Sequence, residues 1–240
     1  MADYNFSFIC AKFISSLASM PAILFMIFAD QFILKQKNWQ PAVLLMLFVI
    51  SWNSILKYLI GVQLMPPMLG YAIPSGHTHL VASFYGYMAY CYKDRMLGKL
   101  IFLSIVAFGW SLIKLHYHSL IDVSVALAFA SVEIYLMHNF FRFQRLFMLE
   151  ISTIILILSY AIGHPEYCFP LMLGTAAYTI SQGLDRQSIC WLLGLWLFIL
   201  PEITFNQNNI ILFVLVLLIF KTSQFEFGPI NVFSRHHRSQ

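Results

Sequence analysis

Two short histidine motifs are the residues of this chain with the clearest capacity for chemistry. The first is PSGH at residues 74–77, and the second is HSLID at residues 118–122, about forty residues later. Each lies at the end of a strongly apolar segment. Because histidine acts as a nucleophile and as a proton donor near neutral pH, two such motifs at one membrane face predict phosphate chemistry.

The PSGH motif has the features of an anion-binding turn. Ser75 and Gly76 open the predicted third helix, where unpaired N–H groups and the positive helix end can receive a phosphate. Glycine also permits a close approach of the backbone. His77, in the first turn, is placed to donate a proton to a leaving alkoxide.

The second motif pairs a histidine with a carboxylate. His118 and Asp122 are four residues apart, so they share a face if the fifth helix begins by His118. The carboxylate would hold one ring nitrogen and leave the other free to attack phosphorus. A purely structural alternative is a helix cap at Ser119 with Asp122 in the first turn. The second histidine and the lysines at the same face favour the catalytic interpretation.

The elements that must position these motifs are membrane helices. The chain has 240 residues, of which 60% are hydrophobic and 10% charged, whereas soluble domains have roughly a quarter charged residues. In a bilayer each backbone polar group must be satisfied within its own helix. We therefore predict an all-α, polytopic membrane bundle that forms a single domain over 1–240. The net charge of +4 is scattered, which argues against nucleic-acid binding.

Hydropathy predicts about nine transmembrane helices separated by polar breaks. Pro21 predicts a kink inside the first. The four cysteines show no CxxC spacing, so we expect packing residues with neither a disulfide framework nor a metal site. The predicted helices are 6–29, 41–64, 78–92, 99–116, 121–138, 146–163, 169–182, 189–204 and 209–221.

The basic residues predict the orientation of these helices. One set of connections has most of the lysines and arginines, and the opposite set has none. Since positive charge favours the cytoplasmic side, we expect the N-terminus outside, the C-terminus inside and both histidine motifs on the outer face. The residues on the predicted inner side are Lys35, Lys37, Lys93, Arg95, Lys99, Arg142, Arg145, Arg186, Lys221, Arg235 and Arg238.

Three lysines lie within apolar segments instead. Lys12 is close enough to the outer surface to extend its ammonium group into water. Lys57 and Lys114 lie toward the face that has the two histidine motifs. Ionisable groups inside membrane segments are costly and usually face a partner or a wet cavity. We therefore expect these two lysines to contribute to a phosphate site.

The order of these residues resembles the three-part signature of the type 2 phosphatidic acid phosphatase superfamily, the membrane relatives of vanadium haloperoxidases. That signature is a lysine followed seven residues later by Arg-Pro, then PSGH, then Ser-Arg, five residues, His, three residues and Asp. The match covers roughly 41–138, the predicted catalytic core, and leaves 139–240 as additional helices without an assigned role. The matching positions are Lys57, residues 74–77, Ser111, His118 and Asp122.

The resemblance implies a role for each matching residue. His118 would form a phosphohistidine, Asp122 would orient it, and His77 would be the acid for the leaving group. The phosphate would be bound by the remaining matching residues. These are Lys57, Ser75, Gly76 and Ser111.

Two positions depart from the signature. Leu64 and Leu112 stand where the family has arginines, and an ammonium does not reproduce the bidentate grip of a guanidinium on phosphate. The local candidates for compensation are Lys114 and His116, while we expect a structural role for His79. We therefore expect this site to bind phosphate more weakly, or in a different way, than a site with the two family arginines.

The resemblance implies a lipid phosphatase or phosphotransferase that needs no metal or other cofactor. Its expected partner is a phosphorylated lipid: a polyprenyl phosphate or diphosphate, phosphatidic acid, phosphatidylglycerol phosphate or a glycolipid of the lipid A kind. In a bacterium we expect the inner membrane and a periplasmic site, and in a eukaryote a luminal one. The alternatives are a non-catalytic lipid-phosphate-binding scaffold and, less favoured, a transporter. Near the predicted inner face, Glu133 and Glu150 are expected to pair with Arg142 or Arg145.

Overall fold

The computed structural model describes residues 6–16, 20–34, 38–64, 70–92, 94–140 and 144–181, and this part of the chain is predominantly helical. Within it β-type pairing is limited to one antiparallel bridge between Gln63 and Tyr71. The α-helices are α1 (Phe6–Ser15), α2 (Met20–Phe28), α3 (Trp39–Ile60), α4 (Gly76–Cys91), α5 (Arg95–Lys114), α6 (Leu120–Phe140), α7 (Gln144–Ala161) and α8 (Phe169–Ser181).

Three of the described helices are long and apolar enough to cross a membrane. They are α3, α5 and the part of α6 over Leu120–Asn139. The all-α class is thus confirmed for the described residues, while the nine spans and their orientation stay predictions. The predicted helices 189–204 and 209–221 lie outside the described residues.

The first apolar segment, predicted as one kinked helix over 6–29, contains two described helices. Helix α1 ends at Ser15, and helix α2 begins at Met20 with Pro21 in its first turn. Proline has no N–H to donate, and the first turn is where that donor is not needed. A π-helical turn over Ala29–Ile33 then follows α2. Residues 17–19 between the two helices lie outside the described residues, so one span over 6–29 stays a prediction.

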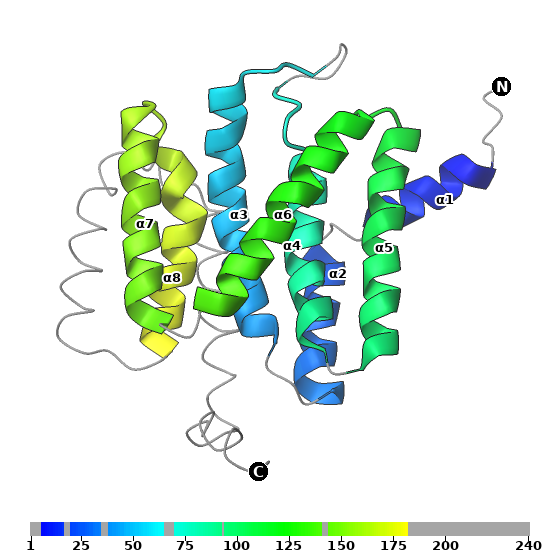
Figure 1. Ribbon diagram of the computed structural model, residues 1–240, viewed down its shortest axis with the longest axis horizontal. Helices are drawn as coiled ribbons and strands as arrows, with labels where there is room; N and C mark the ends of the chain where they lie inside the picture. The colour runs from blue at the N-terminus through cyan, green and yellow to red at the C-terminus, as the bar shows by residue number, and fades with distance from the viewer. Residues whose placement is uncertain are drawn as a thin grey trace, which may run out of the picture. The chain divides into compact units, whose positions relative to one another are not determined.

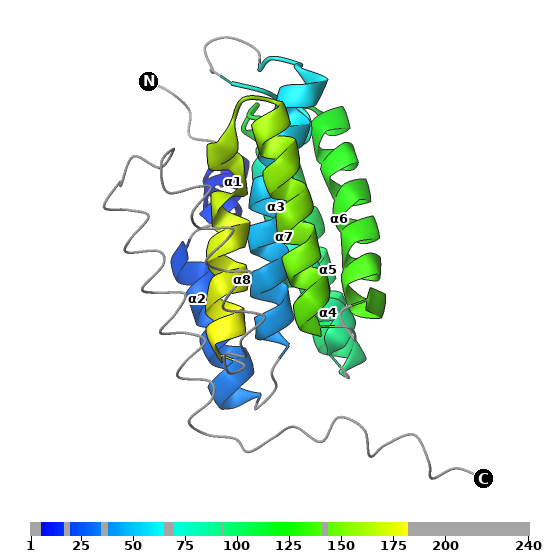
Figure 2. The ribbon, with the colours of Figure 1, turned by 90° about the vertical axis from the view of Figure 1, so that its left-hand side faces the viewer.

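Helix α4 lies between α3, α5 and α6 and packs against all three (Figures 1 and 2). Phe84 and Met88 on α4 are fully buried. Glycines permit this close packing. A Cβ on Gly86 would lie 2.8 Å from Ile134 Cδ1, and one on Gly98 would lie 3.0 Å from the Ala89 carbonyl oxygen. The helix that begins with the PSGH motif is thus held on three sides.

The chain divides into two compact units, residues 1–172 and 173–240. The whole predicted catalytic core over 41–138 lies within the first unit. Cys10, Cys91 and Cys168 have free thiols, and Cys190 lies outside the described residues. The first unit contains all the residues of the candidate site.

Candidate active site

The last turn of α3 supplies the first site residue. Lys57 is half-buried there, and the Gly61 N–H donates to the Lys57 carbonyl oxygen at 3.0 Å. Gly61 ends the helix at φ +68°, a left-handed conformation that glycine adopts at little cost. Beyond it, Ala72 N–H donates to the Val62 carbonyl oxygen at 2.8 Å and returns the chain toward α4.

The PSGH motif forms the N-terminal cap of α4. The Ser75 hydroxyl oxygen accepts from the Thr78 N–H at 3.4 Å, and Ser75 is fully buried. Its backbone N–H donates to the Asp122 carbonyl oxygen at 3.2 Å. This bond ties the PSGH turn directly to the first turn of α6. The two histidine motifs therefore meet, as their chemistry requires.

Gly76 faces two polar side chains of α3, Asn53 and Lys57. A Cβ at this position would lie 3.1 Å from Asn53 Nδ2 and 3.5 Å from Lys57 Nζ. The backbone N–H groups of Gly76 and His77 have no hydrogen-bond partner among the described residues. Two backbone donors, an amide and an ammonium thus gather at one helix N-terminus, an arrangement that suits a phosphate. We call Asn53, Lys57, Gly76 and His77 the cradle.

His118 approaches the cradle from the connection between α5 and α6. Its side chain is 7% exposed, and its Nδ1 lies 3.5 Å from Asp122 Oδ2, which is ion-pair range without a hydrogen bond. Such contacts are often longer in a free enzyme than in the reacting complex. Because Nδ1 faces the carboxylate, Nε2 is the nitrogen left for attack.

Asp122 is held by the structural cap that was the alternative interpretation. Its Oδ2 accepts from the Ser119 N–H at 2.8 Å, and its own N–H donates to the Ser119 hydroxyl oxygen at 3.2 Å. Reciprocal bonds of this kind form a capping box. Helix α6 begins at Leu120, so His118 precedes it. The cap and the His118 contact coexist, and the cap fixes the carboxylate that faces the histidine.

The electrostatic surroundings of His118 keep its ring neutral. Burial is the main cause that lowers the pKa of His118 below its ordinary 6.5. The nearby charge of Asp122 raises this pKa, whereas Lys57 and His77 lower it further. A neutral imidazole has the lone pair that a nucleophile needs. These influences also show that four predicted site residues, His77, His118, Asp122 and Lys57, lie near one another.

A row of buried, hydrogen-bonded polar side chains connects the cradle residue Asn53 to α4 and α6. His79 Nδ1 lies 3.1 Å from Asn53 Oδ1, and His79 Nε2 lies 2.8 Å from Glu133 Oε2. Ser83 Oγ donates to the same Glu133 oxygen at 3.4 Å. Asn53, His79 and Glu133 are 8%, 0% and 7% exposed. The expected pairing of Glu133 with an arginine is therefore wrong, because its partner is a histidine that α4 brings to α6.

The hydrogen bonds among Asn53, His79 and Glu133 indicate where their protons lie. Asn53 Oδ1 can only accept, so His79 Nδ1 must bear a proton. A second proton lies between His79 Nε2 and Glu133 Oε2, and the His79–Glu133 pair therefore has no net charge. A neutral pair is far cheaper to bury in a membrane helix bundle than a lone charge. Because Oδ1 of Asn53 is bound to His79, the Nδ2 donor of Asn53 faces Gly76.

Three other predicted phosphate ligands are not joined to the cradle by any contact among the described residues. The Ser111 hydroxyl is fully buried and donates to the Phe108 carbonyl oxygen at 2.6 Å. The side chains of Lys114 and His116 are exposed. His116 also has a positive φ of 58°, which is uncommon for a residue other than glycine. Their roles stay predictions.

Asn53 is the site residue that the sequence reasoning missed. It lies one turn before Lys57 on α3, and the i, i+4 spacing places both side chains on one face. An amide inside an apolar helix, four residues before a lysine, is the signal that indicates it. Leu112, where the family has an arginine, is buried at 3% exposure.

The chain matches no family model, no curated protein and no solved structure in the comparisons. The geometry alone therefore defines what this site can do. It offers a neutral nucleophilic nitrogen, an orienting carboxylate, a second histidine and a set of anion donors. Such a set fits the transfer of a phosphoryl group. Within the described ranges, no three histidine, cysteine or acidic side chains gather as metal ligands.

Proposed function

We propose that this protein is a membrane-embedded lipid phosphatase or phosphotransferase that works through a phosphohistidine. The observation that supports this most is the convergence of His118, Asp122 and the cradle at the ends of α3, α4 and α6. The resemblance of the motifs to type 2 phosphatidic acid phosphatases points to the same chemistry. Each residue then has a role set by its atoms.

In the first step, His118 Nε2 attacks the phosphorus of the bound lipid. A P–N bond forms as the bond from phosphorus to the lipid oxygen breaks, and His77 gives its proton to the leaving oxygen. Asp122 holds the Nδ1 side of the ring and stabilises the positive charge that develops on it. The cradle donors stabilise the negative phosphoryl oxygens.

In the second step, water attacks the phosphorus of the phosphohistidine. The P–N bond breaks, His77 takes the proton of the attacking water, and phosphate leaves with His118 neutral again. If an acceptor hydroxyl enters in place of water, the same step transfers the phosphoryl group to that acceptor. Both outcomes use the same residues, so the acceptor alone decides between phosphatase and phosphotransferase.

Asn53 supplies part of the phosphate grip that the two family arginines would give. Its Nδ2 is a neutral donor fixed by the bond of Oδ1 to His79, and Lys57 adds the charge. A fixed donor aimed at a developing negative charge contributes roughly 3 kcal/mol to a transition state. The resulting clamp is weaker in charge than a pair of guanidiniums but is rigidly held.

The membrane setting suggests the substrate class and the side of the reaction. The cradle lies at the C-terminal end of α3 and the N-terminal end of α4, and the distribution of basic residues assigns these ends to the extracytoplasmic face. The candidate substrates are a polyprenyl phosphate or diphosphate, phosphatidic acid, phosphatidylglycerol phosphate and a phosphorylated glycolipid. We place the protein in a bacterial inner membrane with a periplasmic site.

Two other functions use the same fold differently. A non-catalytic scaffold would bind the lipid phosphate at the cradle without turnover. A transporter would need ionisable groups distributed along the depth of the bundle. The His79–Glu133 pair is buried and hydrogen-bonded, and the other candidate site residues lie at one end of the helices, which favours a site at one end over a path.

The test uses full-length protein in lipid nanodiscs and a panel of the four lipid classes labelled with ³²P. Free phosphate and any labelled acceptor are followed for the wild type and for His118→Ala. We expect turnover of at least one lipid, insensitive to chelator, and a loss of roughly 10³-fold or more in the variant. His138→Ala, at the far end of α6, is the histidine control.

Negligible and equal release by the wild type and His118→Ala across the panel would overturn the enzyme proposal. Binding of the same lipids without turnover would then identify the scaffold. Chelator-sensitive turnover would contradict the metal-free mechanism.

A further inference from the structure

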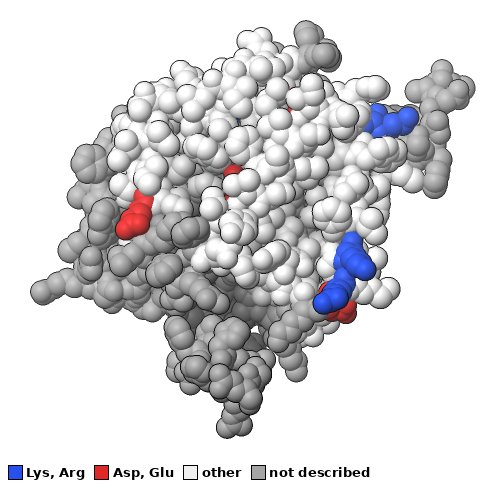
Figure 3. All heavy atoms as spheres, in the orientation of Figure 1, with Lys and Arg blue, Asp and Glu red and all other residues white. Residues whose placement is uncertain are grey.

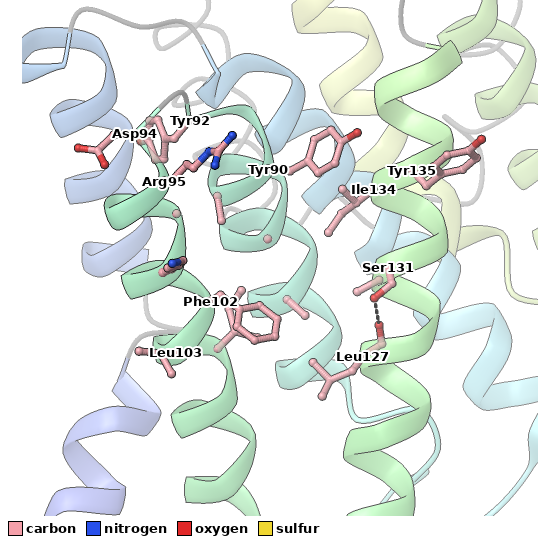
Figure 4. A pocket seen from close by; sticks show the side chains of 17 residues that line it. Tyr90, Tyr92, Asp94, Arg95, Phe102, Leu103, Leu127, Ser131, Ile134 and Tyr135 are labelled. Atoms are coloured by element: carbon pink, nitrogen blue, oxygen red, sulfur yellow. Dashed lines mark hydrogen bonds between the residues drawn. The ribbon is translucent and has the colours of Figure 1, made fainter.

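A cavity lies at the opposite end of α4 from the cradle. It has a volume of about 730 Å³ and is bounded by the C-terminal half of α4, the N-terminal half of α5 and the C-terminal half of α6 (Figure 4). We call it the lower pocket. Fifteen residues separate Gly76 from Cys91 along α4, so the pocket's basic end lies on the order of 20 Å from the cradle. Its volume is typical of a site for a sizeable ligand.

The lining of the lower pocket is polar at one end and apolar at the other. Arg95 lies at the polar end of the view in Figure 4, close to the tyrosines, whereas Phe102 and Leu103 lie at the apolar end with Leu127. Arg95 and Leu103 are about 12 Å apart along α5. A ligand that fits this lining has a polar head and an apolar tail.

The α4 side of the pocket has short side chains. Ala82, Gly86 and Ala89 line it, so the only long α4 side chain of the lining is Tyr90, near the basic end. On the open side, Phe102 and Leu103 are both 60% exposed. An apolar space bordered by exposed apolar side chains on membrane-length helices is continuous with the acyl chains of a bilayer.

The charge of the pocket favours an anion. Arg95 and Lys99 both line it with exposed side chains, and neither has an ion-pair partner among the described residues. Asp94 is the acidic residue of the lining, and its Oδ1 accepts from the Met96 and Leu97 N–H groups at 2.8 and 3.3 Å. This carboxylate caps α5 and leaves the two cations for a ligand. Figure 3 shows blue spheres at this end of α5, with red spheres directly against them and white spheres over most of the adjoining face.

We propose that the lower pocket binds an anionic phospholipid. Its phosphate lies at Arg95 and Lys99, and one acyl chain runs past Phe102 and Leu103 between α5 and α6. Basic groups at the end of an apolar intramembrane cavity recognise anionic headgroups in this way. The site is separate from the cradle, because its cations and lining residues belong to the other ends of the same helices.

The experiment places the full-length protein in nanodiscs of equimolar phosphatidylcholine and phosphatidylglycerol and identifies the retained lipids by native mass spectrometry. For the wild type we expect retained lipid enriched at least roughly fivefold in phosphatidylglycerol. The double variant Arg95→Ala, Lys99→Ala should lower that enrichment to near unity. Ser131→Trp, which fills the pocket from α6, should lower the amount of lipid retained.

Ser104→Trp is the matched control for the filling variant. Ser104 and Ser131 are both exposed serines whose hydroxyls donate to the carbonyl oxygen four residues earlier, at 3.0 and 2.8 Å. Only Ser131 lines the pocket. Equal retention of the two lipids by the wild type would overturn the proposal. The proposal would also be overturned if the double variant Arg95→Ala, Lys99→Ala kept the phosphatidylglycerol enrichment of the wild type and Ser131→Trp lost no more lipid than Ser104→Trp.

Discussion

The two ends of α4 meet their neighbours in opposite ways. At the N-terminal end, the Ser75 N–H bonds to the Asp122 carbonyl oxygen at 3.2 Å, and polar side chains from α3 and α6 converge. At the C-terminal end, α5 and α6 leave a cavity of about 730 Å³ with mostly apolar walls. Chemistry needs groups fixed within fractions of an ångström, whereas a lipid needs room and a charge. One helix thus separates the proposed reaction site from the proposed lipid-binding pocket.

Two histidines near the same end of α4 show a similar contrast. His77, a member of the cradle, is exposed in the first turn, whereas His79 is fully buried between Asn53 and Glu133. Two residues along a helix turn a side chain to a different face. In the proposed mechanism the first histidine exchanges protons with the substrate, and the second holds the Asn53 amide.

Among changes that leave His118 in place, the largest effect should follow from removing the cradle amide. We expect Asn53→Ala to lower kcat/KM for the preferred lipid phosphate by roughly 10²-fold, because a fixed donor to the phosphoryl oxygens is lost. Asn53→Asp should be worse, since a carboxylate repels the phosphate. Ser54→Ala, on the next residue, is the control. A wild-type rate in Asn53→Ala would remove this residue from the clamp.

A smaller effect should follow from breaking the buried pair below the cradle. His79→Leu leaves the Glu133 carboxyl buried without its partner, so we expect a loss of about 2 kcal/mol in the free energy of unfolding. The double variant His79→Leu, Glu133→Leu should recover most of that loss. The measurement is unfolding by denaturing detergent in mixed micelles. Equal stability of the single and double variants would show that the pair does not act as a unit.

The pH profile should report the cation beside His118. The nucleophile reacts when neutral, so activity falls as the pH drops through the pKa of His118, which burial holds below 6.5. Lys57 lowers this pKa further, so Lys57→Met should move the acid limb of kcat/KM to higher pH. Lys12→Met is the control. An acid limb that stays in place or moves to lower pH would show that Lys57 does not lower the pKa of His118.

The smallest effect should come from the other end of α4. The double variant Arg95→Ala, Lys99→Ala should keep turnover at a saturating lipid phosphate within about twofold of the wild type, because surface changes remote from a site leave it nearly unaffected. Steady-state kinetics in phosphatidylcholine nanodiscs measure this. A large loss of kcat would show that the two ends are coupled and not independent.

Much of the helical fold and part of the site follow from local sequence. Membrane segments are long apolar runs, so α3, α5 and α6 are evident from hydropathy, and the PSGH turn and the His118–Asp122 spacing are local patterns. Pairings across the fold are not local. His79 and Glu133 are 54 residues apart, and only the packing of α4 against α6 brings them together. For the same reason the sequence-based prediction that Glu133 pairs with Arg142 or Arg145 was wrong.

Asn53 shows why the clamp was only half predicted. Its polarity is diluted by the apolar run around it, and its function depends on which way α4 turns Gly76 and His79. Pro21 is evident in the sequence, but whether proline kinks a helix or lies in its first turn, as in α2, depends on the surrounding fold. Both cases needed the three-dimensional arrangement.

The measurement that tests the central claim most directly is capture of the covalent intermediate. Full-length protein is mixed with ³²P-labelled dioleoyl phosphatidic acid and with a ³²P-labelled polyprenyl diphosphate, quenched within milliseconds in alkali, and mapped by mass spectrometry. We predict phosphate that is stable to alkali, labile to acid and attached to His118. Turnover with no label on His118, unchanged in His118→Ala, would contradict the account.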